Sequence, residues 1–264
     1  MLEEECVGRY VRLRIPLHIV APTMLFRTTC DINQTAIALI LILGVGCQAR
    51  NNASHDSGMP AARTIPEWRP LFDGRTLNGW QGHRTPGVLP GGWSVEEGTL
   101  VRSGAGGDLV SAEQFANFEL EFEWLVTRGG NSGVFYRIDP GVDVTYMSAP
   151  EYQVLDDAVH RDGQSRLTSA GAAYGLYPSP PGHTRAVGEW NSGRIIVDGT
   201  RVEHWLNGTQ TVKYELRSPD WEQRVKASKF SEWPSYGRAK RGHIGVQDHG
   251  DRVAFRNIRI KVLP

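Results

Sequence analysis

Phe118-Glu-Leu-Glu-Phe-Glu-Trp124 alternates apolar and acidic residues at every position. Because successive side chains of a β-strand point to opposite faces, the apolar residues share one face and the glutamates share the other. The pattern predicts a strand with one buried and one solvated face, which is typical of an antiparallel sheet packed on a core.

Strand-like segments recur on both sides of this stretch. They are residues 134–138, 151–155, 194–197, 201–206, 243–247 and 253–260. Asp198-Gly199 and Asn207-Gly208 separate neighbouring segments, and Asn-Gly and Asp-Gly pairs are strong hairpin signals. Consecutive strands joined by tight turns predict antiparallel pairing.

Helical signals are scarce by comparison. Ser218-Pro219-Asp220-Trp221 carries a capping residue followed by proline and predicts a helix that runs to about residue 230. A second short helix is expected to include residues 112–115. Many short strands with one or two short helices predict an all-β fold, an antiparallel β-sandwich of the jelly-roll type.

Composition excludes several classes of protein. The 264 residues carry 29 Lys+Arg and 29 Asp+Glu, so the formal net charge is zero. A nucleic-acid binder is expected to have a basic face, so we predict no nucleic-acid partner. Cys6, Cys30 and Cys47 all lie in the first fifth of the chain, which excludes a cysteine nucleophile in the folded domain.

The first 47 residues have the character of an export signal. The apolar run over residues 36–46 is short for a membrane span but matches a signal-peptide core. Small residues precede Cys47, as in a bacterial lipoprotein signal, although Gly44 occupies the position that normally holds Leu. We expect residues 1–47 to be an extension and signal, with translation starting at Met24. The alternative is a core helix of the domain.

The rest of the chain divides into a linker and one domain. Residues 48–66 are polar and aperiodic, which predicts a flexible linker, and residues 67–264 form the folded unit. We therefore expect an exported bacterial protein, either periplasmic or anchored to the membrane by a lipid on Cys47.

Polar clusters embedded in strands are the candidates for chemistry, because the common enzyme motifs are absent from the sequence. The clusters occupy residues 129–137, 151–157, 188–191, 203–207 and 245–250. Amide and carboxylate groups can bond vicinal hydroxyls, and aromatic faces cover the C–H side of a sugar ring. Together the clusters predict a carbohydrate-binding groove.

Each cluster also has a structural interpretation. Asn207-Gly208 is typical of a turn, and Trp205 of a core residue. His204 could be a satisfied core histidine, and Asp156-Asp157 a solvated turn.

The chain resembles a known family in segments that follow one another in the same order from about Trp68 to Leu263. They are residues 71–80, 93–98, 130–133, 151–157, 172–177, 188–191, 202–208 and 242–250. The family is that of the 3-keto-disaccharide (3-keto-glycoside) hydrolase domain. The resemblance implies a concanavalin A-like (lectin/glucanase) jelly roll and an exported bacterial enzyme. It also implies a sugar substrate whose C3 hydroxyl has been oxidised by a partner sugar 3-dehydrogenase.

The chemistry of such a substrate defines the groups that a site needs. A ketone at C3 acidifies the C2 proton, so a base can remove it while the C1 substituent leaves by β-elimination; water then adds to the enone. The candidate bases and acids are His249, His204, Glu151 and Asp157. The candidate substrate-binding residues are Arg137, Gln153, Asn131, Tyr174, Glu189, Trp205 and Gln247. A divalent metal ion that polarises the ketone is an alternative to Arg137.

Two other functions stay open at this point. A conventional glycosidase needs two carboxylates about 5–10 Å apart, and the Glu-x-Asp-x-x-Glu spacing of the glucanases of this fold occurs in no predicted strand. Glu119, Glu121 and Glu123 share one face without an aspartate, so we interpret them as solvated. The second alternative is a non-catalytic, lectin-like sugar-binding module.

Overall fold

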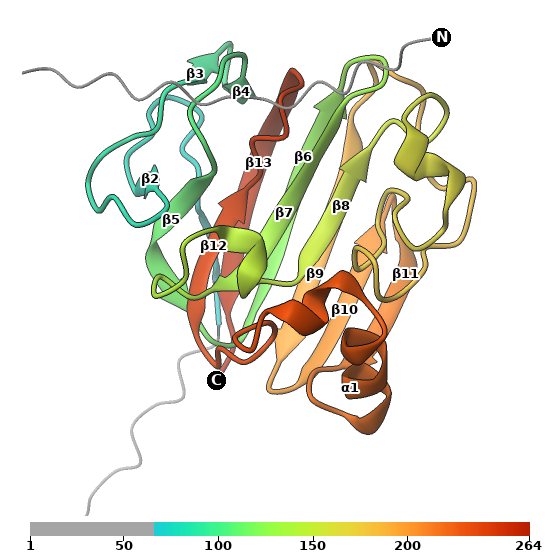
Figure 1. Ribbon diagram of the computed structural model, residues 1–264. Coiled ribbons are helices and arrows are strands. Elements are labelled where there is room, and N and C mark those ends of the chain that lie inside the picture. Colours follow the sequence, from blue (N-terminus) through green and yellow to red (C-terminus); the bar gives the residue numbers. More distant parts are fainter. Residues whose placement is uncertain (1–65) are drawn as a thin grey trace, which may run out of the picture. The chain divides into compact units, whose positions relative to one another are not determined.

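Two antiparallel β-sheets packed face to face make up the part of the chain that the structure describes, residues 66–264 (Figure 1). The coordinates are a computed structural model. The signal-like run, Cys47 and all but the last residue of the expected linker lie outside the described residues. The predicted antiparallel β-sandwich is confirmed.

Within residues 66–264 the larger sheet has eight strands and the smaller sheet has five. The order in the larger sheet is β11 (Thr209–Glu215), β10 (Arg201–Leu206), β9 (Asn191–Asp198), β6 (Phe118–Val126), β13 (Val253–Val262), β4 (Thr99–Arg102) and β3 (Trp93–Glu96), with β1 (Trp68–Pro70) paired to β13. The order in the smaller sheet is β2 (Trp80–Gly82), β5 (Leu109–Phe115), β12 (Gly242–Val246), β7 (Asn131–Ile138) and β8 (Glu151–Leu155).

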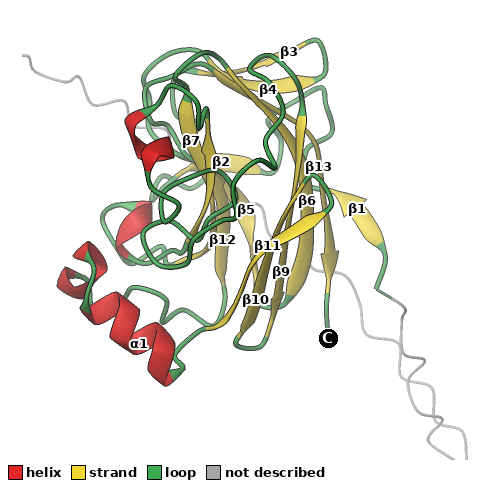
Figure 2. Cartoon of the chain, turned by 90° about the vertical axis from the view of Figure 1, so that its right-hand side faces the viewer, coloured by secondary structure: helices red, strands yellow, loops and turns green. Residues whose placement is uncertain are grey.

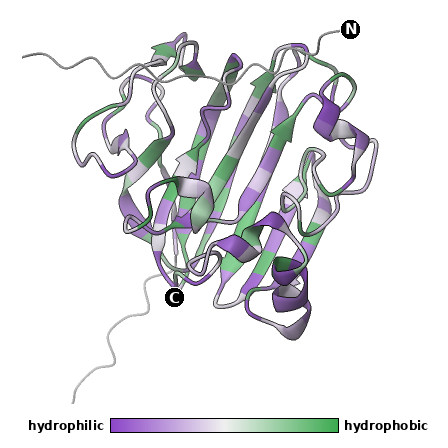
Figure 3. Ribbon diagram, in the orientation of Figure 1, coloured by the Kyte–Doolittle hydropathy of each residue, from purple (hydrophilic) through white to green (hydrophobic). Residues whose placement is uncertain are grey.

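Strand β6 has the two faces that its sequence predicts. Buried and half-buried residues alternate along its whole length, and the strands of the larger sheet carry the same alternation in hydropathy (Figure 3). Phe118, Leu120 and Trp124 are almost fully buried between the sheets. The glutamates face outward and pair with β13 and β9, as in the 2.6 Å contact of Glu121 with Arg259. Exposed ion pairs contribute about 0–1 kcal/mol each, so burial of the apolar face is the larger stabilising effect.

Both predicted hairpins are confirmed. Strands β9 and β10 pair across Gly199, and strands β10 and β11 pair across Asn207-Gly208. Asn207 and Gly208 have φ of 48° and 82°, the left-handed conformation that a two-residue hairpin turn requires at both positions.

The helical predictions are partly wrong. The helix α1 (Pro219–Lys226) begins where expected, and the Ser218 side chain accepts a hydrogen bond from Trp221 N–H at its start. It ends before residue 230, because Ser228 caps a separate 3-10 helix, η3 (Lys229–Glu232). Residues 112–115 are not helical but belong to β5, where pairing with β12 outweighs local helix propensity.

The remaining helical segments are the 3-10 helices η1 (Thr145–Met147) and η2 (Arg161–Gln164). Figure 2 shows the helical segments on the side of the smaller sheet, and α1 also packs on the larger sheet, where Trp221 stacks on Tyr214 of β11 with ring centres 5.2 Å apart. Within residues 66–264, no helix has the length and apolar character needed to cross a membrane.

Candidate active site

Strand β8 divides its side chains between the two faces of the smaller sheet. Tyr152 and Val154 are fully buried in the core between the sheets. The alternation of a strand then turns Glu151 and Gln153 to the opposite face, as the sequence predicts. Strand β7 places Gly133 opposite Gln153, so polar groups of neighbouring strands meet on this outer face.

The outer face carries a cavity of about 200 Å³. Strands β7 and β8 form its floor, the residues after β12 form one side, and η1, η3 and the segment after β8 cover it. The lining residues are Asn131, Tyr146, Glu151, Gln153, Tyr174, Lys229, Phe230, Gln247 and His249. We call this the polar cavity.

Glu151 is the carboxyl group of the polar cavity. Its side chain is nearly inaccessible to solvent, and burial raises its pKa from 4.5 to about 8, although the nearby Lys229 charge opposes the shift. The carboxyl is therefore protonated at neutral pH and can donate a proton. With its amide nitrogen turned toward Glu151, Gln153 donates to Glu151 Oε1 at 3.1 Å and to Ser132 O at 3.3 Å.

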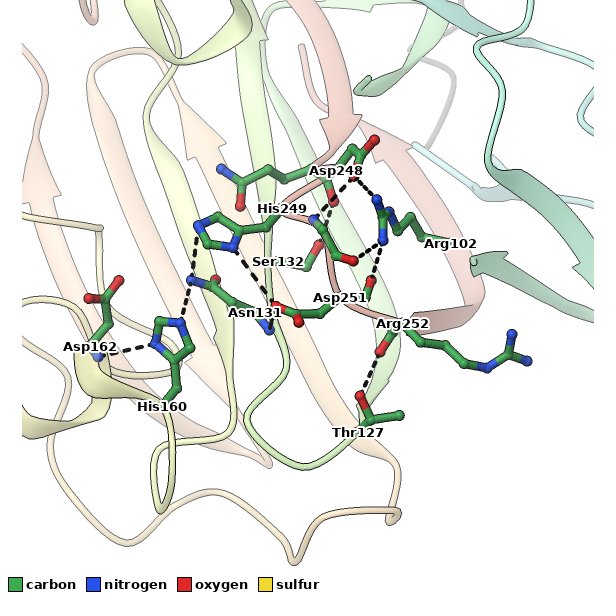
Figure 4. Close-up of polar contacts among 12 residues, drawn as sticks. Arg102, Thr127, Asn131, Ser132, His160, Asp162, Asp248, His249, Asp251 and Arg252 are labelled. Carbon is green, nitrogen blue, oxygen red and sulfur yellow. Dashed lines mark hydrogen bonds and ion pairs between the residues drawn. The ribbon is translucent and has the colours of Figure 1, made fainter. Parts of the chain in front are cut away.

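His249 lies at the edge of the polar cavity with its ring half-exposed. Figure 4 shows the Asn131 amide between two imidazoles: Asn131 Nδ2 lies 3.4 Å from His249 Nε2 and 3.5 Å from His160 Nε2. Behind the ring, His249 Nδ1 lies 3.9 Å from Asp251 Oδ2, which also accepts a hydrogen bond from Asn131 N–H at 3.1 Å. The two ring nitrogens therefore face different groups, the Asn131 amide on one side and the Asp251 carboxylate on the other.

Lys229 brings a positive charge to the polar cavity from η3. Its Nζ lies 4.6 Å from the centre of the Tyr174 ring. The Tyr174 hydroxyl donates to Asp162 Oδ2 at 3.4 Å, and burial raises the tyrosine pKa to about 12. Tyr174 is therefore neutral, and Lys229 is the one ammonium group among the described residues that line this cavity.

The segment that carries Tyr174 runs along the free edge of β8. Gly171 N–H donates to Gln153 O at 2.9 Å, Gln153 N–H donates to Ala172 O at 3.2 Å, and Tyr174 N–H donates to Glu151 O at 3.1 Å. The backbone of β8 is thus fixed on both sides, which holds the two polar side chains of the strand in place.

The structure brings together six of the residues predicted from sequence. They are His249, Glu151, Gln153, Asn131, Tyr174 and Gln247. It also adds residues that sequence reasoning missed, namely Tyr146, Lys229, Phe230 and, beside the cavity, His160. Lys229 and Phe230 fall in the tail of the expected helix and Tyr146 in a loop, where the predictions single out no motif.

His204 is outside the cavity, in the core between the sheets. It has no exposed surface, its Nε2 lies 2.9 Å from the Tyr136 hydroxyl, and burial lowers its pKa to about 4. We therefore correct the expected catalytic role: a neutral, fully enclosed ring on β10 has the structural role that was the alternative.

Arg137 is likewise outside the cavity and does not meet the expectation of a substrate-binding residue. Its backbone has φ of 55°, which interrupts the alternation of β7. The guanidinium donates to Ala116 O and Gly199 O, both at 2.8 Å, and so joins two turns at the end of the sandwich.

Three further predicted residues lie elsewhere. Asp157 accepts a hydrogen bond from Ala170 N–H at 2.8 Å and lines a separate small cavity together with the exposed Glu189. Trp205 lies on the outer face of the larger sheet, where its Nε1 donates to Glu203 Oε2 at 3.0 Å. These positions do not fit the expected contact with a substrate in the polar cavity.

Residues 66–264 contain no group of three or more His, Cys, Asp or Glu side chains placed to hold a metal ion. The described residues therefore do not fit the metal ion considered as an alternative to Arg137, and we derive no step through a metal.

A family model described as the 3-keto-alpha-glucoside-1,2-lyase-like domain matches residues 67–261, nearly the whole described part of the chain. The chain belongs to this family. A curated relative, the 3-keto-disaccharide hydrolase of Bacteroides thetaiotaomicron, is 40% identical over 225 residues, which cover 73% of this chain and 77% of the relative. Both findings confirm the predicted family and the prediction of an enzyme.

Two crystal structures of candidate glycosyl hydrolases from Parabacteroides distasonis ATCC 8503 are similar to this 3-keto-alpha-glucoside-1,2-lyase-like domain. The first is 32% identical with a TM-score of 0.69 and covers 75% of this chain and 94% of its own. The second is 26% identical with a TM-score of 0.59 and covers 75% of this chain and all of its own.

Proposed function

We propose that this protein cleaves 3-keto-glycosides by β-elimination across C1–C2 followed by addition of water. The observation that carries the proposal is the set of ionisable side chains that line the polar cavity. Among the described residues that line it, Glu151 is the one carboxyl group and His249 the one imidazole. A carboxyl group and an imidazole can serve as an acid and a base, which is what elimination beside a ketone requires.

The two groups act on adjacent carbons. His249 takes the proton from C2, and the electron pair of that bond forms the enolate of the C3 ketone. The enolate then collapses to a C1–C2 double bond and breaks the C1–O bond, while Glu151 gives its proton to the departing oxygen. Lys229 supplies positive charge for the enolate oxygen.

Water addition returns both groups to their starting states. The Glu151 carboxylate accepts a proton from water as the hydroxyl adds to C1, and the His249 imidazolium gives its proton to C2. The products are the free 3-keto sugar and the alcohol that formed the leaving group.

The same set of side chains argues against a conventional glycosidase, which needs two carboxylates across one site. Asp162 accepts a hydrogen bond from the Tyr174 hydroxyl and Asp251 lies behind His249, and neither carboxylate lines the polar cavity. A non-catalytic, lectin-like module binds sugar without transferring a proton, so it does not require a buried carboxyl with a raised pKa.

The test is to assay a 3-keto-glucoside and its unoxidised parent side by side in deuterated water. We expect cleavage of the keto form only, with deuterium entering the product at C2. Cleavage of the parent without deuterium at C2 would indicate a glycosidase, and binding of sugar without turnover would indicate a lectin.

Substitutions test the site itself. We expect His249→Gln and Glu151→Gln each to lower kcat by about a hundredfold, the usual contribution of a positioned acid or base. Asp157→Asn is the matched control, because this carboxyl was a candidate but lies outside the polar cavity. Full activity in both cavity variants would refute the assignment.

The proposal extends to the setting of the reaction. The apolar run over residues 36–46 and Cys47 support export and a lipid anchor, and the substrate requires a sugar 3-dehydrogenase that oxidises the C3 hydroxyl beforehand. Mass spectrometry of the mature N-terminus tests the first part: a diacylglycerol on Cys47 supports the anchor, and an unmodified chain that retains residues 36–46 contradicts export.

A further inference from the structure

We propose that a second compartment beside the polar cavity is the leaving-group subsite and that it selects an apolar ring, such as a phenolic aglycone. The inference rests on the proposed function, because it assigns the group that departs from C1 to a place in the molecule.

The second compartment adjoins the polar cavity. It has a volume of about 590 Å³ and shares Tyr146, Gln247 and His249 with its neighbour. The polar cavity, at about 200 Å³, has room for a single sugar ring and little more. A substituent on C1 of that ring must therefore extend beyond it, and the compartment that begins at His249 is open to receive it.

Apolar side chains are concentrated at this compartment. Seven large hydrophobic side chains are exposed among the described residues, and three of them line it: Val88 at 60%, Leu89 at 45% and Tyr146 at 39%. A single exposed leucine needs no explanation, but a cluster beside a polar cavity is typical of a ligand-binding surface. Pro90 extends the same surface.

The loop that presents these side chains is held in shape by its own hydrogen bonds. Val88 N–H donates to Thr85 O at 3.0 Å, and Gly82 N–H donates to Val88 O at 2.7 Å. The apolar surface is therefore formed before a ligand arrives, which lowers the entropic cost of binding.

The three aspartates that line the compartment have partners within the protein. Asp108 accepts hydrogen bonds from Thr145 Oγ1 and from Asp248 N–H, and the Asp248 carboxylate pairs with Arg102 at 2.6 Å. Asp143 pairs with Arg84. The side chains of Asp108 and Asp248 are largely buried and occupied in this way, so they offer few free acceptors to the hydroxyls of a second sugar, whereas the apolar side chains offer contact area to a neutral ring.

The junction of the two compartments has a free acceptor for the sugar. Gln247 Oε1 is buried and has no hydrogen-bond partner among the described residues. A buried acceptor without a partner costs free energy, which a hydroxyl donated by the bound sugar ring would recover.

The test compares the 3-keto derivatives of phenyl glucoside and methyl glucoside. We expect Val88→Asp and Leu89→Asp each to lower kcat/KM for the phenyl substrate about tenfold, while the methyl substrate changes less than twofold. Each variant is compared with the wild type on the same substrate, so the different chemistry of the two leaving groups cancels. Val187→Asp is the control, because it is also exposed, at 44%, but lines neither compartment.

The outcomes separate this inference from the proposed function. If the wild type cleaves neither keto substrate, the proposed function fails. If it cleaves both and the two substrates lose activity equally in Val88→Asp and Leu89→Asp, the proposed function stands and the apolar leaving-group subsite is refuted. Phenol should also inhibit the wild type competitively and lose this effect in Leu89→Asp; unchanged inhibition would count against the subsite.

Discussion

Gly133 lies directly against the Glu151 side chain: a Cβ atom at Gly133 would come within 2.1 Å of Glu151 Oε1. Any larger residue at this position must displace the carboxyl. We therefore expect Gly133→Ala to lower kcat/KM at least tenfold, because a misplaced acid loses its alignment with the leaving oxygen. Overpacking should also reduce the free energy of unfolding by about 1–3 kcal/mol.

Steady-state kinetics and chemical denaturation of Gly133→Ala check both effects. Gly141→Ala is the matched control, because the first side-chain atom it would meet is the end of the half-buried Asp139, at 3.1 Å. Wild-type kinetics in Gly133→Ala would show that the position of the Glu151 carboxyl does not limit the reaction.

The pH dependence of stability follows from the same carboxyl. Glu151 has a pKa of about 8 in the folded protein and an ordinary value of 4.5. Between these values the folded state holds a proton that the unfolded state has lost. Stability therefore falls as pH rises from about 4.5 to about 8, with a contribution on the order of 1 kcal/mol per pH unit.

Glu151→Gln should remove this contribution and flatten the pH dependence. Urea denaturation of wild type and variant at several pH values in this range measures the difference. The exposed Glu189→Gln should keep the wild-type slope, and the same slope in Glu151→Gln would mean that the buried carboxyl does not titrate as described.

Activity should fall above about pH 8, because Glu151 must be protonated to act as an acid. The Lys229 charge opposes the upward shift of this pKa. Lys229→Met should therefore move the alkaline limb of the kcat profile to higher pH, in addition to lowering kcat. Lys226→Met, on the exposed side of α1, should leave the limb in place. Activity that rises through pH 8 would instead make Glu151 the base.

For His204 we predict an effect on stability and almost none on activity. Its ring is enclosed in the core and lies 5.1 Å from the Tyr152 ring, centre to centre. His204→Ala should cost about 2–4 kcal/mol of stability through the cavity it leaves and the hydrogen bond it removes. The kcat/KM of the folded protein should stay within about threefold of the wild type. A hundredfold loss of activity at unchanged stability would restore the catalytic interpretation.

Much of the fold could be predicted from local patterns. The alternation around Phe122 and the Asn207-Gly208 turn specify strands and a hairpin through side-chain direction and backbone sterics, which are local properties. Residues 112–115 show the limit of prediction from local patterns. Their strand conformation depends on pairing with β12, which is more than a hundred residues away in the sequence.

The polar cavity was predictable where it follows a regular strand. Glu151 and Gln153 share a face because they are two residues apart, and the same rule could have placed His204 with Val202 and Leu206 on the core face of β10. The direction of the Arg137 side chain could not be predicted in this way, because its left-handed backbone breaks the alternation of the strand. No residue type next to Arg137 in the sequence indicates that conformation.

Lys229 could not have been placed from sequence. Its position over Tyr174 depends on where α1 stops and how η3 packs against the segment after β8. Such contacts join elements that are distant in the chain, so no local pattern encodes them.

The segment along β8 has one more consequence. Gly171, Ala172 and Tyr174 occupy the backbone groups of Gln153 and Glu151 that would otherwise form an open sheet edge. An open edge is a template on which another chain can add a strand and begin to aggregate. The loop that carries Tyr174 to the cavity thus also protects the most chemically important strand from self-association. Truncating that loop would expose the protein to aggregation and remove part of the site at once.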